Sequence, residues 1–208
     1  MKVFVVGLDG ATLDLIAPWA AQGELPTLAR IMREGAYGDL CTVIPPMTAP
    51  AWTSFMTGVN PGRHGIIDFV QRRAGSYAIA PVNGSHRRAR SLWDLAGAAG
   101  RQVGAINVPL TYPPEPVNGF MVTGMLTPSE ASAPGQTYTW PPELADELDR
   151  AVGGYRIHMK PSYARGSVDE FLDDLPVLTR KQVAAAQHLM RNREWDLFAL
   201  VLRGVDQG

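Results

Sequence analysis

The chain has 208 residues, of which 46% are hydrophobic and 19% are charged. This composition lies outside the range of disordered segments and allows a sizeable buried core. Lysine and arginine total 19 against 20 acidic residues, and the formal net charge of -1 gives none of the basic surface that marks nucleic-acid or membrane-surface binding. We therefore expect one compact domain that binds its ligand locally.

The cysteine count and the apolar runs bear on the compartment. Cys41 is the single cysteine, which excludes an internal disulfide and a cysteine-rich zinc site within this chain. The apolar run near the N-terminus is too short for the core of a signal peptide, and no later stretch approaches the ~18 apolar residues of a membrane span. The sequence therefore predicts a cytoplasmic protein without a membrane partner.

The first elements in chain order are a strand and a helix. Residues 2–8 contain a continuous β-prone run, Val3 to Val6, which predicts a buried parallel strand. Residues 26–34 place apolar side chains at helical spacing between a proline and a glycine, which predicts a helix. A strand followed by a helix is typical of α/β proteins.

The alternation of helix and strand recurs twice further along the chain. A helix face at residues 92–96 precedes a second buried strand at 103–108. A long helix is predicted from a capping box at Ser167 to Glu170, bent or restarted at Pro176, and a strand follows it at 196–206. Three such alternations predict a doubly wound, mainly parallel sheet with helices on both faces.

Two regions do not follow this alternation. Residues 70–90 are predicted to form an exposed hairpin or loop, and residues 109–166 are rich in proline with little periodicity except a helix at 141–151. We expect the second region to be an irregular insertion or cap over the sheet, within a single domain that spans 1–208.

Two aspartates stand where a parallel sheet binds its ligands. Asp9 follows the first predicted strand, at the carboxyl edge of the sheet, although it could also be a turn residue that caps the next helix. Asp206 ends the last predicted strand. If the two strands are neighbours, the carboxylates could hold a divalent metal ion through oxygen ligands. The alternative is that Arg203 pairs with Asp206.

A hydroxyl stands at the beginning of another predicted helix. Thr48 lies in "PPMTAPAW", with Pro50 in the first helical turn. Unpaired backbone N–H groups and the helix dipole favour a phosphate or an alkoxide at such a position, whereas capping of the helix by the hydroxyl is the simpler alternative. His64, in the glycine-rich loop that follows, is expected to fix the turn by hydrogen bonds to the backbone. The other histidines have no partner at metal-ligand spacing.

These residues fall within recognisable motifs. The segments "VFVVGLDGA", "PTLARIMREGAYGDL", "PPMTAPAWTSFMTGVNPGRHGI" and the late "VDQG" resemble the N-terminal portion of the type I phosphodiesterase/nucleotide pyrophosphatase family, in the alkaline phosphatase superfamily. The resemblance implies an alkaline phosphatase-like fold and hydrolysis of phosphodiester or pyrophosphate bonds. It also implies two divalent metal ions, zinc or alternatively manganese, and a small phosphorylated substrate such as a nucleotide.

Carried over residue by residue, the resemblance assigns roles to five positions. Thr48 would be the nucleophile and also a metal ligand, while Asp9 and Asp206 would bind the metals. The backbone N–H of Ala49 would contact a phosphoryl oxygen. Phe69 stands where nucleotide pyrophosphatases have an asparagine that contacts the phosphoryl group, which argues against a nucleotide and predicts an altered substrate pocket.

The resemblance also predicts ligands that this sequence does not contain. In the family an aspartate of the Asp206 type is followed by histidines and an Asp-His pair, whereas the sequence ends at Gly208. We therefore expect the N-terminal part of a longer protein. Two alternatives stay open: a phosphomutase or phosphoryl transferase of the same superfamily, and a truncated non-catalytic domain, since no GxGxxG or GxxxxGK[ST] loop is present.

Overall fold

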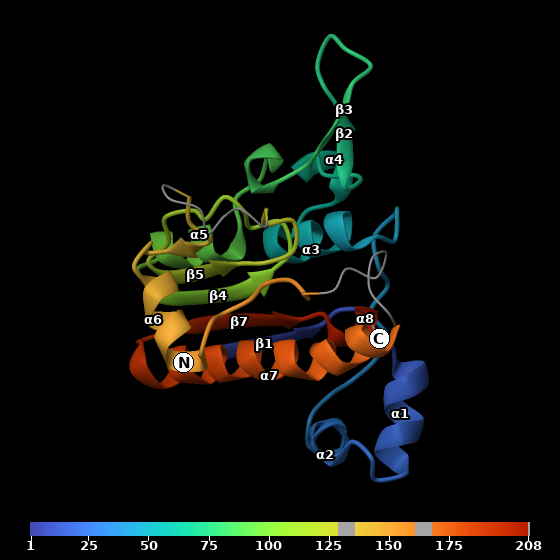
Figure 1. Ribbon diagram of the computed structural model, residues 1–208. Helices are drawn as coiled ribbons and strands as arrows, with labels where there is room; N and C mark the ends of the chain where they lie inside the picture. Colours follow the sequence, from blue (N-terminus) through green and yellow to red (C-terminus); the bar gives the residue numbers. More distant parts are fainter. Residues whose placement is uncertain (129–135, 161–167, 208) are drawn as a thin grey trace.

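The computed structural model describes residues 1–128, 136–160 and 168–207, and its centre is a five-stranded sheet in the order β1-β7-β4-β5-β6 (Figure 1). Four strands are parallel and β6 runs antiparallel to β5. The strands are β1 (Val3–Leu8), β4 (Val103–Val108), β5 (Gly119–Thr123), β6 (Thr139–Trp140) and β7 (Leu197–Leu202). The mainly parallel sheet confirms the predicted fold class.

A separate hairpin and the helices complete the fold. The hairpin consists of β2 (Val70–Arg72) and β3 (Ile79–Pro81), as predicted for an exposed segment in 70–90. The helices are α1 (Leu13–Ala21), α2 (Pro26–Glu34), α3 (Thr48–Thr57), α4 (Pro61–His64), the 3-10 turn η1 (Gly84–His86), α5 (Leu92–Ala98), α6 (Leu144–Val152), α7 (Val168–Asn192) and α8 (Gly204–Gln207).

Helices cover both faces of the sheet. Figure 1 shows α7 along one face and α3 and α5 over the other. Side chains of β7 alternate accordingly: Phe198 and Leu200 pack in the core with α6 and α7, whereas Ala199 and Val201 pack in the core with α3 and α5. All six residues of β4, in the middle of the sheet, are buried. A doubly wound arrangement therefore gives this chain two apolar cores, one on each face.

The first strand is less buried than its sequence predicted. Val3, Phe4 and Val6 are 41 to 48% exposed. The reason is position, because β1 lies at the edge of the sheet and pairs only with β7 among the described residues. A continuous apolar run is typical of a central parallel strand, and the run alone does not say on which side neighbours are present.

The proline-rich region is more regular than predicted. The described part of 109–166 supplies β5 and β6 to the sheet and α6 to the layer that packs with α7. Both strands are short, five and two residues, which leaves little periodicity to detect. The long helix passes through Pro176 without ending, and Ser167 of the predicted capping box lies outside the described residues.

A helix that spans a membrane must be both long and apolar. None of the helices in the described ranges meets both requirements.

Candidate active site

The first and last described strands of the chain are neighbours, which is the condition for Asp9 and Asp206 to lie at one metal site. Leu8 of β1 lies opposite Leu202 of β7, and the Asp9 backbone N–H donates to the Leu202 carbonyl at 2.9 Å. Because the strands are parallel, both reach the same edge of the sheet with their carboxyl ends. Asp9 therefore stands at the ligand-binding edge.

Asp206 does not end the last strand, contrary to the prediction. Strand β7 ends at Leu202, and Asp206 lies in the short helix α8, because the chain turns into that helix at Gly204. The turn nevertheless brings it back to β1. A Cβ atom at Gly10, whose φ is +73°, would lie 2.8 Å from the Asp206 Cα. The two aspartate-bearing segments are thus in contact.

The Asp9 carboxylate is half-buried and only partly hydrogen-bonded. Its Oδ1 accepts from the Trp52 indole Nε1 at 3.0 Å, whereas Oδ2 is buried without a partner among the described residues. Burial raises the pKa of Asp9 and the nearby Asp206 raises it further, against the opposing effects of Trp52 and Arg203. A cation bound here would stabilise the negative charge of the unpaired Asp9 oxygen and of the neighbouring carboxylate.

Arg203 is the basic group of this edge. It is largely buried, which lowers its pKa, and the charges of Asp9 and Asp206 both act in the opposite direction. Within the described chain it makes no ion pair closer than 4.0 Å, so the alternative pairing with Asp206 is not seen. Its charge acts on the two carboxylates from a distance.

These residues fit a divalent metal ion in part. Two neighbouring carboxylates, one with an unpaired buried oxygen, are the ligand type that hard cations prefer. Yet the described residues contain no group of three or more histidine, cysteine, aspartate or glutamate side chains that could hold a metal. Asp9 and Asp206 could therefore supply only part of a ligand set.

Thr48 begins α3 and does not cap it. The N-cap position belongs to Met47, and this end of the helix has no side-chain cap hydrogen bond. Helix geometry leaves the backbone N–H groups of Thr48 and Ala49 without acceptors in the helix, and Pro50, in the first turn as predicted, has no N–H. The half-buried Thr48 hydroxyl thus stands beside free backbone donors.

Trp52 links this helix end to Asp9. It lies one turn after Thr48 on the same helical face and donates its indole N–H to Asp9. Gly7 makes room for the indole, because a Cβ at this position would lie 2.3 Å from Trp52 Cη2. The bond spans 43 positions of sequence, so the local pattern did not reveal it; the spacing of Trp52 four residues after Thr48 is the only signal in the sequence.

His64 fixes the turn after α3, as predicted. Its Nδ1 accepts from the Ile66 backbone N–H at 3.2 Å, so in the neutral ring Nε2 carries the proton and donates to Ser54 Oγ at 2.9 Å. The ring is fully buried, and burial lowers the pKa of His64. His64 is therefore a neutral link between α3 and α4.

The two predicted substrate-binding residues are both packed in the core. The Ala49 side chain is fully buried, which leaves its backbone N–H as the group that a ligand could contact. Phe69 is half-buried just before β2 and packs against the core between the sheet, α3 and α5. A packing function is thus established for Phe69, and contact with a substrate remains a prediction.

One buried polar residue at the same edge, Asn107, was not predicted from the sequence. Asn107 is 4% exposed with a φ of +58°; its Oδ1 accepts from the Tyr155 hydroxyl at 2.5 Å, and its Nδ2 has no partner among the described residues. It lines, with Arg203, a cavity of ≈10 Å³, which is room for about one water molecule. A polar residue within a buried strand, near its carboxyl end, was the signal.

The sheet is alkaline phosphatase-like, and carboxylates and a helix N-terminus without a side-chain cap lie at its carboxyl edge. Together these features indicate the class of protein. The family described as type I phosphodiesterase / nucleotide pyrophosphatase matches residues 3–208, and the chain belongs to this family. No curated protein matches the chain.

Two solved structures share the fold. Phosphonoacetate hydrolase from Sinorhizobium meliloti 1021 in complex with phosphonoacetate is similar with a TM-score of 0.69 and 19% identity, over 100% of this chain and 47% of that chain. The same enzyme in complex with phosphonoformate gives a TM-score of 0.70 and 19% identity, over 99% and 46%. The chain therefore spans about half the length of these neighbours.

Proposed function

We propose that this chain carries the nucleophile and part of the metal site of a metal-dependent phosphoester hydrolase. The observation that carries the proposal is the position of Thr48. Its hydroxyl lies at a helix N-terminus that has no side-chain cap, one turn before Trp52, whose indole N–H donates to Asp9. Family membership supports the same reaction class. The whole protein's activity is part of the proposal.

The helix N-terminus binds the phosphoryl group. The free N–H groups of Thr48 and Ala49 donate to its oxygens, and the helix dipole adds a favourable potential. Both donors belong to a helix whose first turn packs in the core, since Ala49 and Pro50 are buried. Rigid donors of this kind need no rearrangement as negative charge develops.

Thr48 then acts as the nucleophile. Its Oγ attacks phosphorus as the bond to the leaving oxygen breaks, and water later hydrolyses the threonine phosphoester. The hydroxyl must lose its proton, which it does poorly at its ordinary pKa. Two divalent ions, one held in part by Asp9 and Thr48 and the other in part by Asp206, would lower that pKa and neutralise phosphoryl charge. The resemblance favours zinc, whereas two carboxylates and a hydroxyl also suit manganese.

Two neighbours position the carboxylates. Trp52 holds Asp9 through Oδ1 and leaves Oδ2 free of hydrogen bonds. Arg203 offsets part of the negative charge of Asp9 and Asp206, as the directions of their mutual pKa effects indicate. Partners of this kind keep a ligand in one orientation before the ion arrives.

The substrate is a small phosphorylated molecule, with a phosphodiester or pyrophosphate bond as in the family description. A phosphonate is the second candidate, because the structural likeness to phosphonoacetate hydrolase covers the whole described fold. The apolar Phe69 weighs against a nucleotide. A phosphoryl transferase would use the same nucleophile and differ only in the acceptor.

The proposal is tested by turnover in the longest natural form of the chain. Bis-p-nitrophenyl phosphate, p-nitrophenyl phosphate and phosphonoacetate are supplied in turn, with a chelator, with zinc or with manganese. Metal-dependent release of product from at least one substrate is expected. A free p-nitrophenyl phosphate product from the diester, or inorganic phosphate from the monoester or the phosphonate, distinguishes hydrolysis from transfer to a second alcohol. A folded, metal-loaded protein that turns over none of the three would contradict the proposal.

A further inference from the structure

A cavity of ≈580 Å³ lies beside the β2–β3 hairpin, and the charged side chains around it are all basic. Arginines come from two segments, β2 with the residue after it and the segment after η1, and no described residue that lines the cavity is acidic. The whole chain has a net charge of only -1. The positive charge is therefore a local feature of this cavity rather than a property of the whole surface. The arginines are Arg72, Arg73, Arg87 and Arg88.

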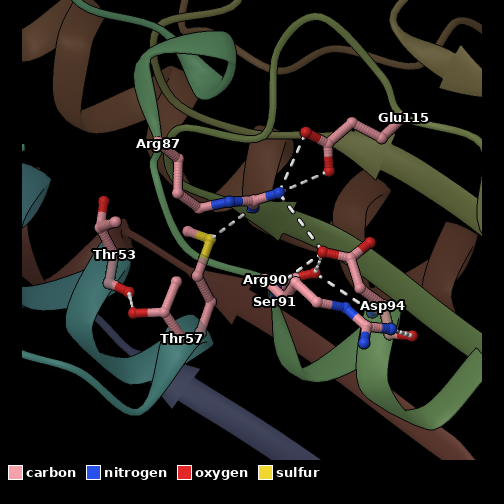
Figure 2. A network of polar contacts seen from close by, with 8 residues as sticks. Thr53, Thr57, Arg87, Arg90, Ser91, Asp94 and Glu115 are labelled. Carbon is pink, nitrogen blue, oxygen red and sulfur yellow. Dashed lines mark hydrogen bonds and ion pairs between the residues drawn. The ribbon is translucent and has the colours of Figure 1, made fainter. Parts of the chain in front are cut away.

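Three of these arginines are not neutralised by an acidic partner among the described residues. Arg72, Arg73 and Arg88 are exposed and form no ion pair with any acidic residue of the described ranges. Arg87 differs, because its guanidinium points to Glu115 and Asp94 (Figure 2) and its side chain is only 7% exposed. Three unpaired cations around one cavity are available to an anion.

Two of the three free arginines, Arg72 and Arg88, have contacts that restrict their positions. Arg72 lies over the Tyr77 ring at 5.6 Å, and the Arg88 backbone N–H donates to the His64 carbonyl at 3.0 Å. Gly65, with a φ of +83°, admits the Arg88 side chain, since a Cβ there would lie 3.2 Å from Arg88 Cδ and Nε. Positions fixed in advance reduce the entropy that ordering these long side chains would otherwise cost.

His86 and Ser85 add further hydrogen-bonding groups to the lining. His86 Nδ1 accepts from the Asn83 backbone N–H at 3.0 Å, so the proton of the neutral ring is on Nε2, which can donate. Ser85 adds a hydroxyl. The lining thus offers guanidinium and imidazole donors and a hydroxyl group without a carboxylate, which is the chemistry that recognises phosphate-class oxyanions.

The cavity is separate from the Thr48 end of α3. Ser54, which contacts the His64 ring, lies six residues after Thr48, or about 9 Å along the helix axis. Arg87, which also lines the cavity, contacts Met56, eight residues after Thr48, or about 12 Å along the helix axis. We propose that this cavity is a second anion site, in which Arg72, Arg73 and Arg88 bind a phosphate-class oxyanion apart from the phosphoryl group at Thr48.

Calorimetric titration with inorganic pyrophosphate, in the presence of a chelator and at low salt, tests the site in the full natural chain without any turnover. The Arg72→Gln/Arg73→Gln/Arg88→Gln variant is expected to bind at least about tenfold more weakly than the unmodified chain. The matched control, Arg33→Gln/Arg101→Gln/Arg191→Gln, removes the same charge elsewhere and should bind normally. Equal affinity in the cavity variant and the unmodified chain, or no binding by the unmodified chain, overturns the proposal.

A second variant guards against misfolding. Replacement of the same three arginines by lysine keeps the charge, and it should retain more of the pyrophosphate affinity than the glutamine variant; equal loss in both would overturn the assignment to charge.

Kinetics identify the source of the anion. A higher KM only for substrates with a second phosphate group assigns it to the substrate, and unchanged KM values assign it to a free ligand. Failure of the Thr48 mechanism would leave the titration unaffected.

Discussion

At the scale of single residues, the candidate site depends on close contacts between backbone segments. Gly7 gives space to Trp52, and Gly10 gives space to the backbone of Asp206. Neither glycine carries chemistry, yet each allows a functional side chain to reach the carboxyl edge. A side chain at position 10 would push α8 away from β1, and with it one of the two carboxylates.

Gly10→Ala is therefore expected to destabilise the protein more than its backbone conformation alone requires. An alanine at a φ of +73° costs about 1 kcal/mol, and a Cβ 2.8 Å from a backbone atom adds at least about 1 kcal/mol through overpacking. Urea unfolding measures the sum. Gly23→Ala is the matched control, because Gly23 has a φ of +84° with no atom within 4 Å of the added Cβ. Equal losses in the two variants would show that the contact with Asp206 carries no cost.

At the scale of elements, one buried arginine joins several segments. Arg87, directly after η1, bonds both carboxylate oxygens of Glu115 and approaches Asp94 of α5 at 3.6 Å, and its Nη1 lies 3.4 Å from Met56 Sδ of α3 (Figure 2). Asp94 is also engaged by Ser91, which caps α5. The arginine thus fixes α3 and α5 against the connection that leads to β5.

Glu115→Ala tests this network. The substitution leaves a nearly buried guanidinium whose remaining ion pair among the described residues is the longer one with Asp94, and we expect a loss of about 2 kcal/mol in the free energy of unfolding. Glu34→Ala removes an acid from an exposed pair with Arg33 and should cost less than about 0.5 kcal/mol. Denaturant titration of both variants measures the difference. A Glu115 variant as stable as the Glu34 variant would contradict the structural importance of the network.

His64 makes the α3–α4 pair sensitive to pH. Burial lowers the pKa of the folded ring below its ordinary value of 6.5, so the unfolded chain binds the proton more readily. The stability that the neutral ring contributes is complete above pH 6.5 and is lost as the pH falls below it. Urea unfolding at pH 7.5 and 5.5 should show this loss, and His64→Gln should reduce it. Equal pH dependence in the variant and the unmodified chain would assign the loss to other groups.

At the scale of the whole molecule, local sequence patterns predicted the fold class but not which strands pair with which. The helices α2 and α5 and the strand β4 follow from apolar spacing and from proline and glycine at their ends. The exposure of β1 and the strand nature of β6 depend on which segments pair, and local periodicity does not contain that information. The fold class was therefore accessible from sequence while the edges of the sheet were not.

The residues of the candidate site were likewise predictable from the sequence only in part. Asp9 and Thr48 could be singled out because each lies directly at the end of a predictable element. Trp52 and Asn107 escaped, because the contacts that reveal them join residues 43 and 48 positions apart. Asp206 was placed one element too early, since the turn into α8 has no distinctive sequence. Positions on elements were predictable, and contacts between elements were not.

The role of Thr48 is tested most directly by the turnover of Thr48→Ala in the longest natural form of the chain, loaded with zinc or manganese. If Thr48 is the nucleophile, kcat falls at least about 10³-fold while the metal content, measured by elemental analysis, is largely retained. Thr57→Ala, at the other end of the same helix, is the control and should keep its activity, because its hydroxyl bonds only within α3 and to the adjacent turn. Near-normal turnover by Thr48→Ala would contradict the account, because the hydroxyl at the start of α3 would then not be the nucleophile.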